Sequence, residues 1–260
     1  MSPASSCLRS LRDTRAIATR SLVTSICGTS ASAAADASRK PLSDTLAGYV
    51  LATGPGGCPP PGLLSHDGGM ADDVLGGRLL VATPLLGDPS FRRTVILIVE
   101  DDPAEGTLGV VLNRPTDVPV GQVLEPWTEL ATGPSVVFRG GPVSPNSALA
   151  LALARGADEP LGWRPLDGSS VMSRVGLVDL EVPPELLADG VSEFRVFAGY
   201  AGWGPGQLTA EIDEGAWYVL PGEPADAFYA EPDRLWQAVL RRQGGELAMV
   251  ATYPDDPALN

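Results

Sequence analysis

Side chains that could do chemistry are unevenly distributed along the 260 residues of this chain. All three cysteines and the single histidine precede residue 70, and residues 70–260 also contain no lysine. That region therefore cannot hold a Ser-His-Asp triad, a cysteine nucleophile, a Schiff-base lysine, a Walker lysine or a zinc site built on thiolate or imidazole. Carboxylates remain, and they could bind a hard cation or transfer protons.

The acidic side chains cluster at three places, at Asp101-Asp102, at residues 211–214 and at Asp255-Asp256. None of the clusters has the ligand spacing of an EF-hand, and nothing in the sequence pairs two of them in space. We therefore expect solvated turns and helix ends, with no catalytic residue, no metal site and no cofactor. A rival hypothesis, an enzyme that uses a divalent ion held by Glu211 or Asp213, stays open.

A glycine-rich decapeptide, residues 199–208, has four glycines, two aromatic residues and a proline between a predicted strand and a predicted helix. Its Gly-x-Gly-x-Gly spacing superficially resembles a nucleotide-binding loop, because exposed amides at a helix start can bind an anion. However, Pro205 removes one amide donor, Trp203 adds bulk, and the full dinucleotide spacing is absent. The pattern favours a rigid strand-to-helix joint that Tyr200 and Trp203 anchor.

Two further turns carry polar or glycine residues after predicted strands. Arg114, in Asn113-Arg114-Pro115, could bind an anionic ligand or pair with a carboxylate such as Glu100 or Asp101, and the acidic composition favours the ion pair. Gly140-Gly141-Pro142 predicts a tight turn that could line a cleft. The candidate ligand-binding cleft formed by the three turns comprises Asn113, Arg114, Gly140, Gly141, Pro142, Tyr200, Gly202, Trp203, Gly204, Gly206 and Gln207.

Apolar and β-branched runs predict the strands that position these turns. The predicted strands are 78–83, 94–100, 108–113, 136–139, 170–179, 193–198, 216–220 and 248–252. The predicted helices are 120–130, 183–188, 206–214 and 232–243, whereas 148–154 is ambiguous between strand and helix. We expect 94–100 and 108–113 to pair antiparallel, because a short turn joins them. Adjacent strands with irregularly placed helices favour an α+β fold over a doubly wound sheet.

The N-terminal segment, residues 1–69, differs from the rest in composition. It is rich in Ser, Ala, Thr, Gly and Pro, and it shows no periodicity. It could be an arginine-rich targeting peptide, a disordered extension, or the product of an over-extended gene prediction whose natural start is Met70. Residues 70–260 have the length and apolar content of one domain. Two of the three interpretations give a cytoplasmic protein.

The net charge limits the partners. The whole chain carries −14, and residues 70–260 combine twelve arginines with 28 acidic residues. Binding to DNA phosphates needs clustered lysine and arginine, so direct nucleic-acid binding is not expected. No apolar run approaches the roughly 20 residues that a membrane-spanning helix needs.

Five motifs together resemble the YqgE/AlgH family of bacterial proteins, over about residues 74–258. They are Gly77–Pro84, Asp88-Pro89-x-Phe91, the run from Gly106 to Pro115, Gly140–Val143 and Gly199–Leu208. The resemblance implies an α+β fold whose bent, bifurcated sheet forms a pseudo-barrel with a few flanking helices. It implies no established enzymatic activity, although one branch is labelled as a transcriptional regulator of alginate production.

The chain departs from the family pattern at two positions. Family members often have a histidine where this sequence has Asp101, and another in the stretch that here reads 148–151. A mechanism that requires either histidine would not operate here.

We therefore expect a soluble, non-enzymatic binding or regulatory protein that acts through a protein or small-molecule partner at the cleft. The alternatives are a carboxylate- and divalent-ion-dependent enzyme or nucleotide-binding module, and a transcriptional regulator that contacts DNA.

Overall fold

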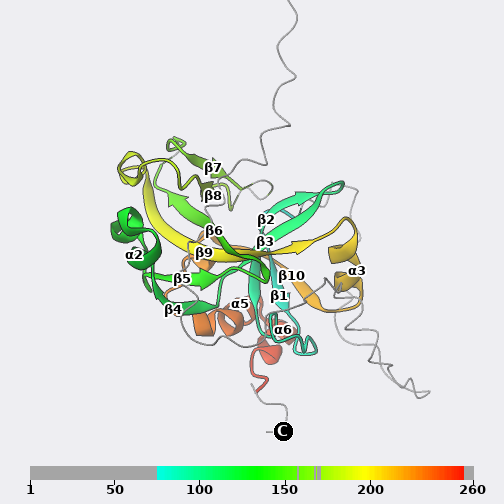
Figure 1. Ribbon diagram of the computed structural model, residues 1–260. Helices are drawn as coiled ribbons and strands as arrows, with labels where there is room; N and C mark the ends of the chain where they lie inside the picture. Colours follow the sequence, from blue (N-terminus) through cyan, green and yellow to red (C-terminus); the bar gives the residue numbers. More distant parts are fainter. Residues whose placement is uncertain (1–74, 157, 167, 169–170, 255–260) are drawn as a thin grey trace, which may run out of the picture.

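The computed structural model describes residues 75–156, 158–166, 168 and 171–254, and within them it shows a strongly curved sheet flanked by short helices (Figure 1). The strand order along the sheet is β10-β1-β2-β3-β9-β6-β8-β7, and β5 and β4 branch from β9. The three interpretations of residues 1–69 lie outside the described residues. None of the helices in the described part of the chain is long and apolar enough to span a bilayer.

One half of the sheet is an antiparallel arrangement of β10, β1, β2 and β3. Their bounds are Arg78–Ala82 for β1, Val95–Asp102 for β2, Gly106–Val111 for β3 and Trp217–Pro221 for β10. The predicted antiparallel pairing of β2 with β3 is confirmed. In β2, Leu97 faces one hydrophobic cluster and Ile96 and Ile98 face another. The strand reads as a continuous apolar run because both of its faces are covered.

The long strand β9, Val191–Trp203, joins this half to the rest of the sheet. Its first part pairs antiparallel with β6, Val143–Ala154, and parallel with β5, Val136–Arg139. Its last residues pair with β3 instead. The remaining strands are β4 (Pro115–Pro119), β7 (Trp163–Pro165) and β8 (Val175–Val178). The sheet thus forks along β9, which confirms the expected bent, bifurcated α+β fold.

The fork depends on a close approach between the Gly140-Gly141 turn and Gly199 of β9. Gly140 accepts a hydrogen bond from the Val111 amide and donates one to the Ala198 carbonyl, both at 2.8 Å. A Cβ added to Gly140 would lie 2.2 Å from the Gly199 carbonyl oxygen. Gly199 has φ +70°, and its own Cβ would lie 2.7 Å from the Val143 oxygen. Only glycine fits at either position.

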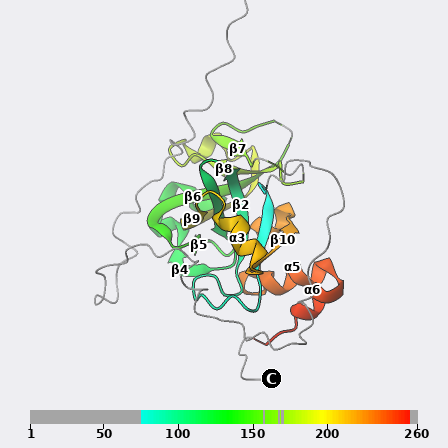
Figure 2. The ribbon, with the colours of Figure 1, turned by 90° about the vertical axis from the view of Figure 1, so that its right-hand side faces the viewer.

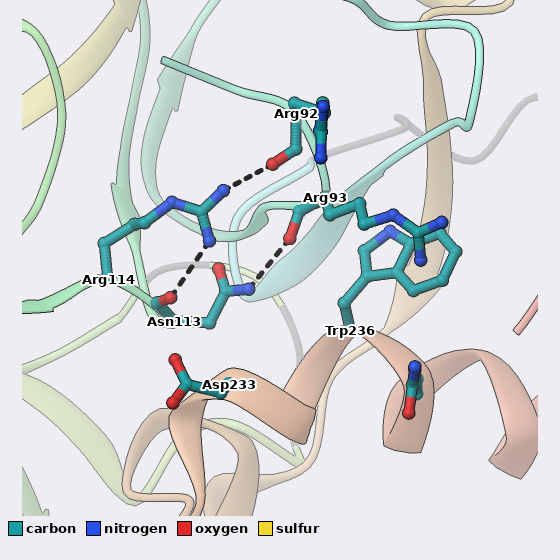
Figure 3. Close-up of a pocket in the computed structure, with 7 residues that line it drawn as sticks. Arg92, Arg93, Asn113, Arg114, Asp233 and Trp236 are labelled. Carbon is teal, nitrogen blue, oxygen red and sulfur yellow. Dashed lines mark hydrogen bonds between the residues drawn. The ribbon is translucent and has the colours of Figure 1, made fainter. Parts of the chain in front are cut away.

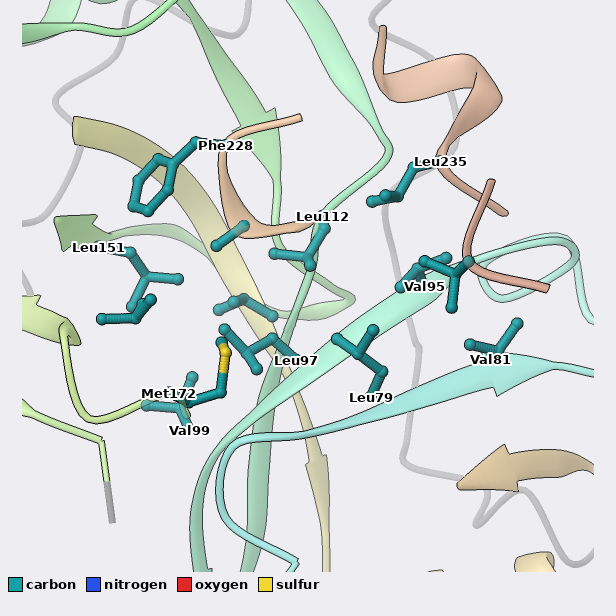
Figure 4. Packing of buried hydrophobic residues seen from close by; sticks show 14 of the residues in the cluster. Leu79, Val81, Val95, Leu97, Val99, Leu112, Leu151, Met172, Phe228 and Leu235 are labelled. Atoms are coloured by element: carbon teal, nitrogen blue, oxygen red, sulfur yellow. The ribbon is translucent and has the colours of Figure 1, made fainter. Parts of the chain in front are cut away.

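Short helices cover the curved sheet. Their bounds are Val120–Val123 (α2), Glu125–Leu130 (η2), Pro184–Leu186 (η3), Gln207–Asp213 (α3), Pro224–Ala227 (α4), Pro232–Arg234 (η4), Leu235–Gln243 (α5) and Gly245–Val250 (α6). Helix α5 buries the predicted apolar face, with Leu235, Trp236, Val239 and Leu240 all 2% exposed or less. Figure 4 shows Leu235 above the core residues Val95 and Leu79. Figure 2 shows α5 and α6 together, away from β7 and β8.

Two predicted elements need correction, and one ambiguous segment is resolved. Residues 248–252 do not form a strand, because positive φ angles at Gly244 and Gly245 turn the chain into α6. Within the predicted strand 170–179, only the part from residue 175 to 178 is strand, and residues 169–170 lie outside the described residues. The ambiguous segment 148–154 is strand, because β9 and β8 pair with it from both sides.

The decapeptide is also less of a loop than predicted. Strand β9 continues through Trp203, so the joint to α3 comprises only residues 204–206. The glycines at positions 199 and 202 did not stop the strand, since pairing with β3 and with Val143 holds this part of β9 in place.

Substitution of two glycines with nearly the same φ angle distinguishes the cost of backbone strain from the cost of steric overlap. Gly206 has φ +74° with open space around it, whereas Gly199 has φ +70° and tight backbone contacts. We expect Gly206→Ala to reduce the free energy of unfolding by about 1 kcal/mol through strain alone. Gly199→Ala should reduce it by about 2–4 kcal/mol, because the overlap with the fork backbone adds to that strain. Urea unfolding of both variants measures the difference, and equal losses would contradict a packing role for Gly199.

Candidate functional site

The candidate cleft residues fall in two separate places. Arg114, Gly141 and Pro142 line a groove at the fork of the sheet. Gly204, Gly206 and Gln207 lie at the start of α3, with Trp203 packed beneath them in a different hydrophobic cluster. Tyr200 and Gly202 lie on β9 between the two places. The structure therefore brings together the Arg114 and Gly140-Gly141-Pro142 turns, and the α3 end of the decapeptide does not line the groove.

A buried carboxylate fixes the α3 end of the decapeptide. Glu211 is 5% exposed, and its Oε2 accepts hydrogen bonds from the indole nitrogens of Trp203 at 3.0 Å and Trp217 at 2.9 Å. Its Oε1 accepts a third from Gln207 Nε2 at 3.0 Å. The expectation that Glu211 is solvated is wrong. Helix α3 turns this side chain inward between Trp203 and Trp217, whose proximity in space does not follow from their positions in the sequence.

The start of α3 is closed by its own side chains. Gln207 Oε1 accepts a hydrogen bond from the Gly204 amide at 3.1 Å, so this amide is engaged. The Trp203 ring packs against Phe91 and Trp217, with ring centroids 6.5 and 6.1 Å apart. This arrangement is that of a packed structural joint, and it leaves Trp203 only 4% exposed.

The fork groove, about 420 Å³ in volume, opens where β3 and β5 lie beside β9. Its lining residues are Pro89, Ser90, Val111, Arg114, Thr116, Val137, Arg139, Gly141, Pro142, Pro145 and Ala198. Val137 and Arg139 share one face of β5 because side chains alternate along a strand, while Phe138 points into the core. The Thr116 hydroxyl donates to the Val137 carbonyl at 2.6 Å, which holds β4 along the same wall.

A smaller polar hollow of about 190 Å³ lies on the other side of Arg114 (Figure 3). Its lining residues are Arg92, Arg93, Asn113, Arg114, Asp233, Trp236 and Gln237. Asn113 is buried and structural, because its Nδ2 donates to the Arg93 carbonyl at 2.8 Å and its Oδ1 accepts from the Val95 amide at 2.9 Å. The Arg93 guanidinium lies 4.4 Å from the centre of the Trp236 ring. Asn113 thus forms part of the wall of the hollow, and both of its polar side-chain atoms are hydrogen-bonded within the protein.

Arg114 separates the fork groove from the polar hollow. Its guanidinium donates to the carbonyls of Asn113, at 3.2 Å, and Arg92 (Figure 3). Burial lowers the pKa of Arg114; the negative charge of Asp233 opposes this, and the positive charges of Arg139 and Arg92 add to it. Three guanidinium groups therefore concentrate positive charge at one point of an acidic protein.

The predicted ion pair between Arg114 and Glu100 or Asp101 is wrong. Glu100 forms its salt bridge with Arg164. Asp101 accepts hydrogen bonds from the Thr107 hydroxyl at 2.6 Å and the Leu75 amide at 3.1 Å. Both carboxylates lie at the far end of β2 from Arg114, because the turn into β3 reverses the chain.

Arg139 is the charged groove residue that sequence reasoning missed. It is exposed, and within the described residues no hydrogen bond or salt bridge engages its guanidinium. Its position was informative: a charged residue ends the apolar strand 136–139 immediately before Gly140-Gly141-Pro142. The antiparallel pairing of β4 with β5 places it beside Arg114, and the Arg139 amide donates a hydrogen bond to the Arg114 carbonyl at 2.8 Å.

The acidic clusters supply no metal site in the part of the chain that the structure describes. No three His, Cys, Asp or Glu side chains there lie close enough together to hold a metal ion. Both carboxylate oxygens of Glu211 accept hydrogen bonds from other side chains of the protein. The cluster at Asp255-Asp256 lies outside the described residues.

The buried carboxylate gives a stability prediction. Glu211→Ala should lower the free energy of unfolding by about 3 kcal/mol, because it leaves two buried indole N–H groups without an acceptor. Asp213→Ala, at an exposed position two residues further along, should change it by less than about 0.5 kcal/mol. Thermal unfolding followed by tryptophan fluorescence compares the two variants, and equal stability would refute the anchoring role of Glu211.

Comparisons with known proteins agree with the fold and the motifs. A family model described as AlgH-like matches residues 79–248. A UPF0301 protein of Streptomyces coelicolor is 61% identical over 190 residues, which cover 72% of this chain and 95% of the relative. A UPF0301 protein of Mycobacterium tuberculosis is 44% identical over 195 residues, covering 75% and 95%.

Two solved structures are similar as well. The crystal structure of a Corynebacterium diphtheriae protein has a TM-score of 0.63 at 33% identity, covering 68% of this chain and 91% of that one. The solution structure of the AlgH protein from Pseudomonas aeruginosa has a TM-score of 0.51 at 26% identity, covering 73% and 99%. The resemblance drawn from the five motifs is confirmed, and this chain belongs to the AlgH-like family.

Proposed function

We propose that this protein is a non-enzymatic binding protein that takes up a small molecule in the fork groove. The observation that carries the proposal is the groove itself, about 420 Å³ in volume and lined by both apolar and arginine side chains. Small-molecule sites in proteins are typically concave, mostly apolar, and supplied with a few convergent polar groups. The volume lies within the range of such sites, about 300–1,000 Å³.

The position of the groove supports a regulatory role. Val111, Val137 and Ala198 line it from β3, β5 and β9, so a bound molecule would contact both branches of the fork at once. A ligand that binds only the native arrangement stabilises it by mass action. Binding in the groove would therefore tighten the fork, and a partner protein that contacts either branch could respond to this change.

Two rival functions have less support. A carboxylate-dependent enzyme would need acidic groups in the groove, and no carboxylate among the described residues lines it; Asp233, whose charge acts on Arg114, lines the adjacent polar hollow. A regulator that contacts DNA directly would work against the net charge of −14. If the protein regulates transcription, contact with another protein is the route we favour. A cytoplasmic location remains part of the proposal.

A groove-blocking variant tests the proposal. Ser90 is exposed and lines the groove, so Ser90→Trp should fill it without disturbing the core. In a thermal-shift screen of a metabolite library, at least one compound should raise the melting temperature of the wild type by several degrees. That shift corresponds to about 2.7 kcal/mol at a concentration 100 times Kd. The same compound should not raise that of Ser90→Trp.

Ser192→Trp is the matched control, since Ser192 is also exposed and lies outside the groove. It should respond to the compound as the wild type does. A screen without hits, or hits that Ser90→Trp retains, would refute small-molecule binding in the fork groove.

A further inference from the structure

The charged residues that line the fork groove all have the same sign. Its two charged lining residues are Arg114 and Arg139, and no carboxylate lines it. Asp233 lines the polar hollow on the far side of Arg114, together with Arg92 and Arg93. In a chain with a net charge of −14, such a local excess of cations is unusual.

The two arginines differ in the hydrogen bonds that their guanidinium groups form within the protein. Arg114 is half-buried, and its guanidinium already donates to the backbone carbonyls of Asn113 and Arg92, two residues that line the polar hollow. Arg139 is exposed, and within the described part of the chain neither a salt bridge nor a hydrogen bond engages its guanidinium. A guanidinium presents up to five donors in a planar fork that matches a carboxylate or a phosphate. Arg139 is therefore the residue with donors to offer a ligand.

The rest of the groove lining is apolar. Six of its residues have no polar side-chain atom and are not glycine: Pro89, Val111, Val137, Pro142, Pro145 and Ala198. Three of the six are prolines, whose rings hold the wall in shape without a backbone donor. Simple inorganic anions would leave this apolar surface uncovered, whereas a molecule with an apolar body would bury it.

From this arrangement we infer that the ligand of the fork groove is an organic anion, in which a carboxylate or phosphate group binds Arg139 beside Arg114 and an apolar body lies against the proline and valine wall. The inference rests on the proposed function, since it assigns the chemical class of the molecule that the groove takes up. The positive charges of Arg92 and Arg139 already act on Arg114, and an anion placed between Arg114 and Arg139 would relieve that repulsion.

Four probes separate the contributions of charge and apolar body. They are 1-naphthyl phosphate, 1-naphthoate, the neutral 1-naphthylmethanol and inorganic phosphate, each titrated into the full-length ¹⁵N-labelled protein. At least one of the two aromatic anions should shift the backbone amide of Gly141 and the side-chain Nε–H of Arg139. It should bind at least about tenfold more tightly than the neutral probe or inorganic phosphate. The stronger of the two anions identifies the group as phosphate or carboxylate.

The variant Arg139→Gln should weaken binding of the aromatic anion at least about tenfold and leave the affinity for the neutral probe unchanged. Arg241→Gln is the matched control, because Arg241 is exposed on α5 and lines neither the fork groove nor the polar hollow. It should bind like the wild type. Since Arg139 is exposed, its replacement should preserve the spectrum of the folded protein.

The outcomes separate this inference from the proposed function. If the neutral probe shifts Gly141 with the same affinity as the anions, or if Arg139→Gln binds like the wild type, the groove binds small molecules but the inferred anion selectivity is wrong. If inorganic phosphate binds as tightly as the aromatic anions, the apolar wall has no role and the inference is likewise wrong. If no probe at millimolar concentration shifts a groove residue, both the inference and the proposed function are refuted.

Discussion

The close contact between the Gly140-Gly141 turn and β9 at Gly199 is the constraint on which the rest of this structure depends. A Cβ at Gly141 would lie 2.2 Å from the carbonyl carbon and oxygen of Tyr200, and one at Gly140 would lie as close to the Gly199 oxygen. With hydrogen atoms in place of side chains, the backbones approach closely enough for Gly140 to bond both Val111 and Ala198. One residue thereby connects the end of β5 to β3 and to β9, and the sheet can fork without leaving backbone groups unpaired.

The fork groove is a consequence of this geometry. Where two branches of a sheet diverge from a common strand, their side chains cannot fill the space between them as they do in a continuous sheet. Strand β6 adds to the opening, because its pairing with β9 shifts between Val143 and Ala148 and Ser144 takes φ 48°. The prolines of this region hold the wall in a fixed shape. The positive charge of the groove has a separate origin, since the pairing of β4 with β5 brings Arg139 beside Arg114.

Trp203 of the decapeptide belongs to a buried aromatic cluster and does not line a ligand-binding loop. Trp203 and Trp217 share the buried carboxylate of Glu211, and Phe91 packs against both of their rings. This cluster fastens α3 and β10 to the end of β9. It keeps the last residues of β9 in line with β3, directly beside the fork at Gly199.

Most of the helices and strands could be predicted from local sequence patterns. The apolar runs of β1, β2 and β3 and the apolar face of α5 could be recognised from sequence because burial requires those residues in that order. Segment 248–252 could not, since its apolar residues fit either state and the turn at Gly244 and Gly245 decided it. The glycines and Arg114 of the candidate site were found from turn chemistry, whereas the pairing partners of Arg114, Glu100 and Asp101 were not.

The sequence by itself determined the α+β class, the family, and the exclusion of cysteine, histidine and lysine chemistry from residues 70–260, because these depend on residue identity and local order. Only the tertiary structure decided that Glu211 is buried, that Trp203 lies away from the groove, and that Arg139 lies beside Arg114. Each of these depends on pairing between strands, such as β3 with β9 and β4 with β5, and on contacts that join residues far apart in the chain, which no local pattern encodes.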